Sequence, residues 1–552
     1  MTQTVDMAAV GSAVRPRDSM RETVESIVVA FILAFVFRAF IVEAFRIPTG
    51  SMAPTLYGAH GEIRCDNCAY SFAFNMPPAV PETLKVYCPN CRHGNEAHNS
   101  AARPFAWSGG DRILVLKWPY DLFGKWLGPR RWDVAVFKDP KDSDTNFIKR
   151  LVGLPGEVFE IIDGDVYAAP ADTVPEAIRH KLNPKAPQAL TSSEHARLDA
   201  LLKIQRKTRP AQQSLWMLHY DHDFPPARDE AASPAWVAHD GDDAESGWRT
   251  DSSRLRFDGR EGPERIVSLT GRPIQDIYGY NLLGAAPGQG SVSVGDARLE
   301  FVLAPREARG QFSASLSKDG TAFVARVHAD GRVDLCMSRP DRGDFEEVIG
   351  TARIAPPSPE RPIRVAIENV DFRVSVEIDG QVVLETNDAV YSPSLPQLRE
   401  LERQVALASR SFDNAPSRVR ARFAASGMPL EVWHVRVLRD VYYCRVDPPG
   451  GLMHEVEPST GRGTAGRPIL LREDEFYACG DNSPQSKDSR LWPAREVSPF
   501  LRARGSAYQV GTVPRDQMIG KAFFVYWPAG KRIVKDAGPP IIPNVGEMRV
   551  IR

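Results

Sequence analysis

The feature that most constrains the fold of this chain is an apolar run near its start, "SIVVAFILAFVFRAFIV", from Ser26 to Val42. Eleven apolar residues follow one another from Ile27 to Phe37 before Arg38 interrupts them. A helix needs about 20 largely apolar residues to cross a bilayer, and an arginine near one end can reach the interface. The run therefore predicts a single transmembrane anchor over residues 26–45, after a polar tail over residues 1–25.

The charges around the run predict its orientation. Arg15, Arg17 and Arg21 precede it, so the positive-inside rule places the tail in the cytoplasm and the rest of the chain beyond the cell (inner) membrane. A cleaved signal peptide and a buried helix are the alternatives. Arg38 and Glu43 stand where a signal peptide needs small residues before its cleavage site, which favours a retained anchor.

Length and charge limit the classes of function. A chain of 552 residues is too long for one ordinary core and predicts several domains. Its net charge of -1 gives no support for binding along nucleic acid, so we expect no nucleic-acid partner.

The residue pattern after the anchor predicts a mainly β protein. "WDVAVFKDP" and "NFIKRLVGLPGEVFEIIDGDVYAA" are rich in valine and isoleucine, and Asp163-Gly164 is a strong hairpin signal because glycine tolerates positive φ. Residues 251–439 form a series of short alternating segments separated by turns at Asp319-Gly320, Asp330-Gly331 and Asp379-Gly380. This spacing predicts a β-sandwich insert.

A proline-rich region over residues 170–250 is predicted to be a linker that contains a helix. Thr191 and Glu194 stand at capping-box spacing, and Leu198, Leu201 and Leu202 fall on one helical face.

Two residues are candidates for nucleophilic chemistry. Ser51 lies in "IPTGSMAPTL", where a serine after glycine is by itself an ordinary turn former. Lys149 lies in a strand whose apolar neighbours include Phe147 and Leu151, and burial lowers the pKa of a lysine toward neutrality. A serine hydroxyl needs such a base to become a nucleophile. The alternative for Lys149 is an ordinary solvated lysine.

Four blocks in order resemble bacterial type I signal peptidases, which are membrane-bound serine proteases with a Ser-Lys dyad. The blocks are "IPTGSMAPTL", "GDRILV", "NFIKRLVGLPGE" and "GDNSPQSKDSR". The resemblance implies an all-β catalytic domain of the signal-peptidase type, split by insertions over residues 46–62, 99–169 and 440–552.

The resemblance also implies a role for each matching residue. Ser51 would be the nucleophile and Lys149 the general base, and the Ser51 amide and the Thr49 hydroxyl would form the oxyanion hole. Ser486 would orient the lysine, with Asp481, Asp488 and Arg490 as supporting residues. Ser483-Pro484 replaces the Arg-Asp that is commoner in the family, and Thr49 replaces a serine. No cofactor is expected for catalysis.

By the same resemblance, the substrates would be signal peptides of exported preproteins, cut after Ala-x-Ala-like sites. Membrane lipid and the protein-export translocon would be partners. "GKAFFVYWP", from Gly520 to Pro528, is either an aromatic surface that rests in the lipid interface or a buried core strand.

Two CxxC pairs predict a separate insert over residues 63–98. Cys65, Cys68, Cys88 and Cys91 have the ligand spacing of a zinc ribbon, which favours a structural zinc. Disulfides are the main alternative because the segment follows the anchor into an oxidising compartment. Free thiols are the third.

The β-sandwich insert resembles concanavalin-like or laminin-G-like domains in texture. It is either a binding module for an unknown glycan or protein ligand, or a structural spacer. Two other functions therefore stay open for the whole chain: a catalytically inactive, membrane-tethered binding protein, and a self-cleaving Ser-Lys protease.

Overall fold

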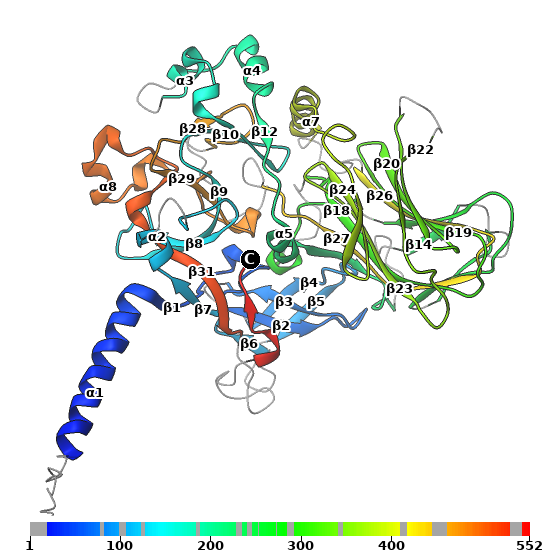
Figure 1. The fold of residues 1–552 in the computed structure, drawn as a ribbon, viewed down its shortest axis with the longest axis horizontal. Coiled ribbons are helices and arrows are strands. Elements are labelled where there is room, and N and C mark those ends of the chain that lie inside the picture. The colour runs from blue at the N-terminus through cyan, green and yellow to red at the C-terminus, as the bar shows by residue number, and fades with distance from the viewer. Residues whose placement is uncertain are drawn as a thin grey trace, which may run out of the picture.

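The computed structural model of this chain describes residues 19–77, 82–98, 106–122, 127–183, 188–227, 235–239, 246–251, 253–271, 273–283, 292–340, 346–408, 417–443, 461–529 and 544–552. Within these ranges the protein is mainly β, as predicted (Figure 1). Arg15 and Arg17, on which the predicted orientation of the anchor rests, lie outside them.

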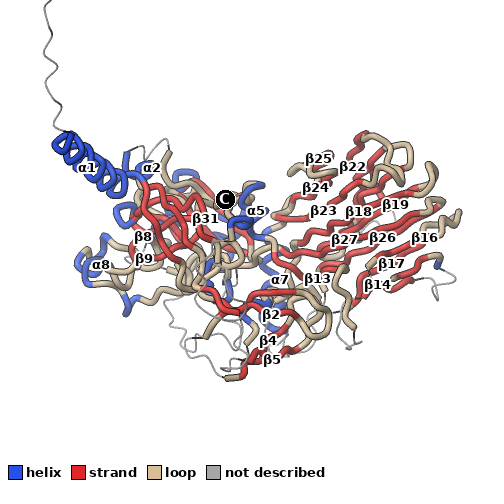
Figure 2. Tube along the Cα trace, turned by 90° about the horizontal axis from the view of Figure 1, so that it is seen from below, coloured by secondary structure: helices blue, strands red, loops and turns tan. Residues whose placement is uncertain are grey.

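The apolar run forms helix α1 (Ser19–Val36), which continues through a π-helical turn at Phe37–Ile41. Over the described part of the chain, Met20–Ile41 is the one helix long and apolar enough to cross a membrane. None of its apolar window is buried among the described residues, and it projects from the end of the molecule opposite the β-sandwich (Figures 1 and 2). The predicted anchor end at residue 45 is wrong, because Val42–Arg46 form strand β1, whose backbone pairs with β7 (Arg112–Leu116).

One large sheet gathers segments from both ends of the chain. Its order is β1-β7-β31-β8-β9-β29-β30, with β32 paired to β31. Apolar clusters cover it on both sides, around Ile113 and Val115 on one and around Phe137 and Leu151 on the other. The remaining strands are β8 (Val134–Lys138), β9 (Asn146–Gly153), β29 (Glu475–Cys479), β30 (Val513–Pro514), β31 (Met518–Trp527) and β32 (Arg549–Val550).

A second, smaller sheet has the strand order β12-β11-β10-β28. Its strand β10 follows β9 of the large sheet along the chain. Asp163 and Gly164 form the predicted tight turn, with φ of 53° and 83°, between β10 and β11. The capping box of Thr191 and Glu194 is confirmed at the start of α4, and Leu198 is buried. The elements are β10 (Glu157–Ile162), β11 (Asp165–Pro170), β12 (Lys203–Ile204), β28 (Ile469–Leu470), α3 (Glu176–Lys181), α4 (Ser192–Asp199) and α5 (Arg209–Leu215). Further α-helices within the described ranges are α2 (Trp118–Leu122), α7 (Leu395–Ala408) and α8 (Pro499–Ala503).

The insert is a sandwich of two antiparallel sheets with an apolar core between them, where the rings of Phe301, Phe312 and Phe423 touch. One sheet contains β13 (Met217–Asp221), β15 (Trp248–Thr250), β16 (Arg254–Phe257), β18 (Ala297–Pro305), β23 (Ile363–Val370), β24 (Arg373–Ile378), β25 (Gln381–Glu385) and β27 (Leu430–Arg439). The other contains β14 (Ala235–Ala238), β17 (Arg265–Thr270), β19 (Gln311–Lys318), β20 (Thr321–His328), β21 (Arg332–Ser338), β22 (Glu346–Arg353) and β26 (Val419–Ser426).

The sandwich begins earlier than the predicted boundary at residue 251. Strands β13, β14 and β15 come from the region predicted to be a linker, and β13 pairs with β27 through backbone hydrogen bonds. The three segments Met217–Asp221, Ala235–Ala238 and Trp248–Thr250 are therefore part of the sandwich rather than of a free connection.

The two CxxC pairs lie on a small module beside the large sheet. Its strands are β2 (His60–Arg64), β3 (Ser71–Asn75) and β6 (Ala106–Ser108) in one sheet, and β4 (Thr83–Tyr87) and β5 (Gly94–His98) in a hairpin. Ala69 and Arg92, each directly after the second cysteine of a pair, have positive φ, which closes both CxxC turns.

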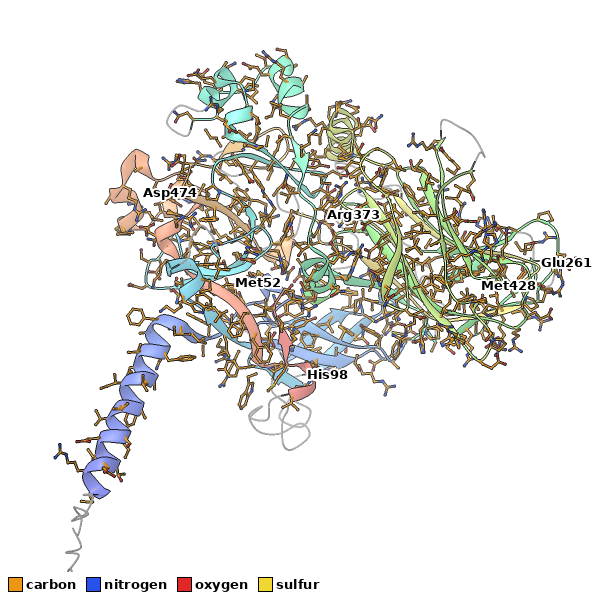
Figure 3. All side chains as sticks on the ribbon, viewed as in Figure 1. Met52, His98, Glu261, Arg373, Met428 and Asp474 are labelled. Atoms are coloured by element: carbon orange, nitrogen blue, oxygen red, sulfur yellow. The ribbon has the colours of Figure 1, made fainter. Side chains whose placement is uncertain are left out.

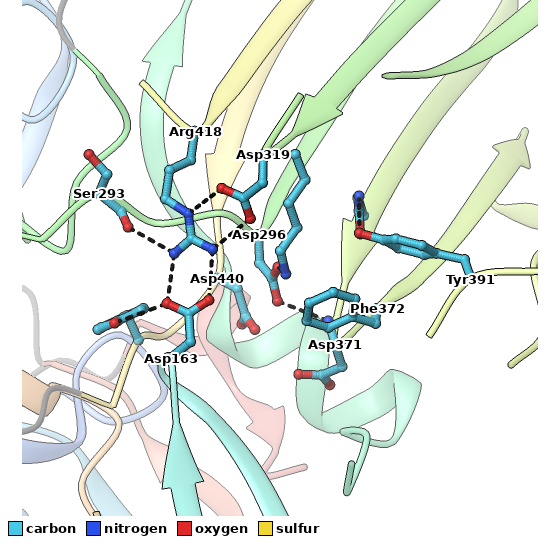
Figure 4. Close-up of polar contacts among 12 residues, drawn as sticks. Asp163, Ser293, Asp296, Asp319, Asp371, Phe372, Tyr391, Arg418 and Asp440 are labelled. Atoms are coloured by element: carbon cyan, nitrogen blue, oxygen red, sulfur yellow. Dashed lines mark hydrogen bonds and ion pairs between the residues drawn. The ribbon is translucent and has the colours of Figure 1, made fainter. Parts of the chain in front are cut away.

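Buried charges join the sandwich to the β10–β11 hairpin (Figure 4). Arg418 of the sandwich donates to both oxygens of Asp163 at 2.7 Å and to both oxygens of Asp319 at 2.7 and 2.8 Å. Next to this group, Lys318 contacts Asp296, and Lys207 contacts Asp371 and Asp440. Asp165 lies beside these carboxylates, and burial raises its pKa well above the usual value.

We predict that Arg418→Met destabilises the protein by about 3–5 kcal/mol, because it leaves the buried Asp163 carboxylate without its partner. Arg420, two residues further along the chain and within strand β26, is exposed, and Arg420→Met should change stability by less than about 0.5 kcal/mol. Urea unfolding of the full chain in detergent, followed by tryptophan fluorescence, measures both. Equal losses in the two variants would contradict the importance of this junction.

Candidate active site

Ser51 lies on a short 3-10 turn, Gly50–Met52, next to the large sheet. Two apolar side chains, Ile47 before the turn and Met52 within it, are buried in the cluster that covers one side of this sheet. Figure 3 labels Met52 near the middle of the molecule, between the anchor and the sandwich. The buried neighbours fix the turn while the Ser51 side chain stays half-buried.

Lys149 meets Ser51 from strand β9, 98 residues further along the chain. Its Nζ donates to the Ser51 Oγ at 2.7 Å and lies 5.4 Å from the centre of the Phe147 ring. Only 4% of Lys149 is exposed, and this burial lowers its pKa to about 8 despite the opposing charges of Asp488 and Asp481. An amine with this pKa is largely neutral in mildly alkaline solution and can accept the proton of a serine hydroxyl.

The segment from Gly480 to Arg490 lies behind this pair. A Cβ on Gly480 would come within 2.2 Å of the Ser486 Oγ and 2.5 Å of the Ser51 carbonyl oxygen, so only glycine fits there. Ser486 is buried close to Ser51, but its hydroxyl has no hydrogen-bond partner among the described residues. The predicted bond from Ser486 to Lys149 therefore stays a prediction.

Asp488 and Arg490 form a buried pair within the same loop. The Arg490 guanidinium donates to the Asp488 carboxylate at 2.8 and 2.7 Å, and Asp488 accepts from the Gly480 amide at 2.9 Å. Burial alone would raise the pKa of Asp488, but the charge of Arg490 holds it below the usual value. The Asp488 carboxylate is thus ionised and ties Gly480 in place behind Ser51.

Asp481 has a partner that we did not single out in the sequence, Arg150. Both side chains are fully buried, and two bonds of 2.8 Å join the guanidinium to the two carboxylate oxygens. Arg150 also donates to the Trp132 carbonyl and to the Thr55 hydroxyl. Arg150, the residue after Lys149, therefore joins strand β9 to the loop behind Ser51.

Asn482 also escaped notice in the sequence. Its backbone amide donates to the Ser51 carbonyl at 3.1 Å, and its side-chain amide donates to the Gly50 carbonyl at 2.9 Å. Both carbonyls of the turn are thus held from one buried residue. The sequence feature that could have identified Asn482 is its position directly after Asp481 in the fourth block, "GDNSPQSKDSR".

The predicted oxyanion donors lie at the start of the turn. Thr49 is extended, with φ of -124° and ψ of 157°, and is exposed. The Ser51 amide is in the first helical turn, where an N–H has no carbonyl partner within the helix. The amide belongs to Ser51 itself and Thr49 is two residues earlier, so both donors are close to the Ser51 Oγ in the sequence.

The four predicted cysteine ligands come together and are buried. Cys65 and Cys91 have their sulfurs 3.6 Å apart, as do Cys68 and Cys88, and all four sulfurs lie within 4.8 Å of one another. A disulfide would require about 2.05 Å, whereas four thiolates around a zinc ion lie about 3.8 Å apart. The Asn67 amide and the Asn90 side chain donate to sulfurs, as partners of metal-bound thiolates do. The geometry fits a closed, four-thiolate metal site.

Comparison with known proteins gives relatives that match about a quarter of the chain. Signal peptidase I of Pseudomonas fluorescens is 31% identical over 126 residues, which cover 23% of this chain and 29% of the relative. Signal peptidase I of Rickettsia bellii (strain OSU 85-389) is 24% identical over 143 residues, which cover 26% of this chain and 37% of the relative. The aligned part spans about a third of the length of these curated relatives.

Among solved structures, the laminarinase from Rhodothermus marinus aligns with 41% of this chain and 98% of its own, at 13% identity and a TM-score of 0.25. The carbohydrate recognition domain of Emp47p covers 37% of this chain and 88% of its own, at 8% identity and a TM-score of 0.23.

The family model described as "Signal peptidase, peptidase S26" matches residues 20–223 and 450–527, which together are just over half of the chain. The gap between the two matched ranges contains most of the β-sandwich. The chain therefore belongs to the signal peptidase family, peptidase S26, and carries a β-sandwich inside the family's domain.

Proposed function

We propose that this protein is a membrane-anchored signal peptidase that cleaves signal peptides from exported preproteins with a Ser51-Lys149 dyad. The observation that carries the proposal is the bond of 2.7 Å between the buried Lys149 Nζ and the Ser51 Oγ. Among the residues that the structure describes, the Ser51 hydroxyl is hydrogen-bonded to Lys149 and to no His or Asp, so the lysine is the base within reach.

The first half of the reaction follows from this geometry. Neutral Lys149 takes the proton from Ser51, and the Ser51 oxygen attacks the carbonyl carbon of the scissile bond. The Ser51 amide and the Thr49 hydroxyl stabilise the oxyanion, and a single donor of this kind typically contributes about 3–4 kcal/mol. Lys149 then protonates the leaving amine, which leaves an acyl-enzyme on Ser51.

The second half uses the same residues. Lys149, neutral again, takes a proton from water, which attacks the acyl-enzyme carbonyl. The bond to the Ser51 oxygen then breaks, Lys149 returns the proton to that oxygen, and the signal peptide leaves with a free carboxylate. Asp488 and Arg490 do not react in this scheme. They hold Gly480 against the turn, and Arg150 with Asp481 holds the strand of the lysine.

The position of the anchor fits a substrate that emerges from the membrane. Helix α1 is followed almost directly by strand β1 and by the turn Gly50–Met52, which we call the nucleophile turn. Few residues therefore separate the bilayer from Ser51. In the proposed topology the N-terminus is cytoplasmic and the catalytic domain extracytoplasmic. The substrate would carry small residues at an Ala-x-Ala-like site, delivered by the export translocon at the lipid surface.

We predict that Ser51→Ala and Lys149→Ala each lower kcat/KM for preprotein cleavage by a factor of about 10⁴ or more. Lys203, on the exposed edge strand β12, supplies the matched control, and Lys203→Ala should cleave at the wild-type rate. Gel analysis of a purified preprotein with the full chain in detergent measures all four proteins.

The outcomes of this experiment separate the alternatives. Cleavage that persists in either dyad variant rejects the Ser-Lys mechanism. A wild-type chain that leaves preproteins intact favours the inactive binding protein, and one that cuts only itself favours the self-cleaving protease.

We also propose that Cys65, Cys68, Cys88 and Cys91 hold one structural zinc ion. Four thiolates close the coordination shell, so such an ion takes no part in peptide hydrolysis. The ion would fix the two CxxC turns relative to each other.

The zinc proposal predicts about one zinc per chain by mass spectrometry of the native protein, and loss of that zinc in Cys65→Ser. Cys336, a buried cysteine of the sandwich, provides the control, and Cys336→Ser should keep the metal. Metal-free wild-type protein with two disulfides between these cysteines would contradict the proposal.

A further inference from the structure

A loop of the β-sandwich reaches the nucleophile turn. It connects β17 to β18 and contains a short 3-10 turn, Gly279–Asn281. Asn281 and Asn482 form a reciprocal amide pair, in which the Asn281 Nδ2 donates to the Asn482 Oδ1 at 2.6 Å and the Asn482 Nδ2 donates to the Asn281 Oδ1 at 2.8 Å. Asn482 is the residue that holds the carbonyls of Gly50 and Ser51.

The neighbouring residue of the loop packs directly on the turn. A Cβ on Gly50 would lie 2.4 Å from the Tyr280 Cε1, so the Tyr280 ring contacts the backbone of the residue before Ser51. Tyr280 is only 2% exposed, and its ring packs 5.5 Å from that of Tyr57. Glycine at position 50 therefore leaves the space that the Tyr280 ring of the insert occupies.

The loop is supported from its other side by the cysteine module. A Cβ on Gly279 would lie 2.7 Å from the Pro89 Cβ, within the second CxxC pair. Asn90 of the same pair donates to the carbonyls of Asp221 and Phe224 in and after strand β13, at 3.2 and 2.7 Å. The Gly279–Asn281 turn is thus held between the cysteine module and the nucleophile turn.

We propose that the Tyr280-Asn281 element of the sandwich positions the nucleophile, with Asn281 acting through Asn482 on the turn that carries Ser51. The inference rests on the proposed peptidase function. It makes the insert part of the active-site structure, because Tyr280 packs on the turn and Asn281 holds the residue that bonds to the turn, Asn482.

The physical effect of losing Asn281 is predictable. The Asn482 side-chain oxygen would lose its donor, and the freed amide could rotate away from the Gly50 carbonyl. The turn would then sample more conformations, and the bond of 2.7 Å between Ser51 and Lys149 would be formed for a smaller part of the time. Loss of such alignment lowers kcat and leaves KM nearly unchanged.

The test compares Asn281→Ala with Gln381→Ala in the full chain in detergent. Gln381 is exposed on strand β25, at the edge of its sheet, and belongs to neither the nucleophile turn nor the loop that contacts it. We expect Asn281→Ala to lower kcat about tenfold with KM within twofold, and Gln381→Ala to match the wild type. Hydrogen exchange at the amides of the 47–56 segment should be faster in Asn281→Ala alone.

Hydrogen exchange also keeps this inference separate from the proposed function. If the wild type cleaves no preprotein, the peptidase proposal fails, while exchange at the turn still decides whether Asn281 positions it. Unchanged exchange in a folded Asn281→Ala protein overturns the inference. If Asn281→Ala does not fold, Asn281→Asp takes its place, since its carboxylate can still accept from Asn482 but cannot donate to it.

Discussion

The proposed activity depends on a lysine amine that is buried against a serine hydroxyl. Water would keep Lys149 charged, and a charged lysine bonded to Ser51 cannot take its proton. The fold removes that water by placing Lys149 in a central strand of a sheet covered on both faces. Its neighbours Arg150 and Phe147 fix the strand from each side, one through a buried ion pair with Asp481 and the other through aromatic packing around Trp492.

The two insertions are built into this arrangement. Arg418 of the sandwich neutralises Asp163 in the hairpin that follows the lysine strand, and the cysteine module backs the loop that contacts the nucleophile turn. A module that is tethered through a flexible linker shares few contacts with its host, whereas this sandwich contributes buried charges to the junction and an amide pair to the site. We therefore regard the sandwich and the peptidase domain as one structural unit.

Local signals predicted the local features well. The apolar run, the Asp-Gly hairpin, the capping box at Thr191 and the grouping of the cysteines all depend on residues close in sequence. The end of the anchor was placed too late because strand pairing of β1 with β7 decides it, and no local pattern reveals that pairing. Arg150 and Asn281 were missed for the same reason: the first looks like a solvated strand residue, and the second contacts Asn482, which lies 201 positions further along the chain.

The pH dependence of kcat/KM for a peptide substrate tests the central claim most directly, because it reports the ionisation of the free enzyme. With neutral Lys149 as the active form and its pKa lowered to about 8, kcat/KM should rise tenfold per pH unit below that value and level off above it. A rise centred near the ordinary lysine value of about 10.4, or a rate independent of pH between 6 and about 9, would contradict the account.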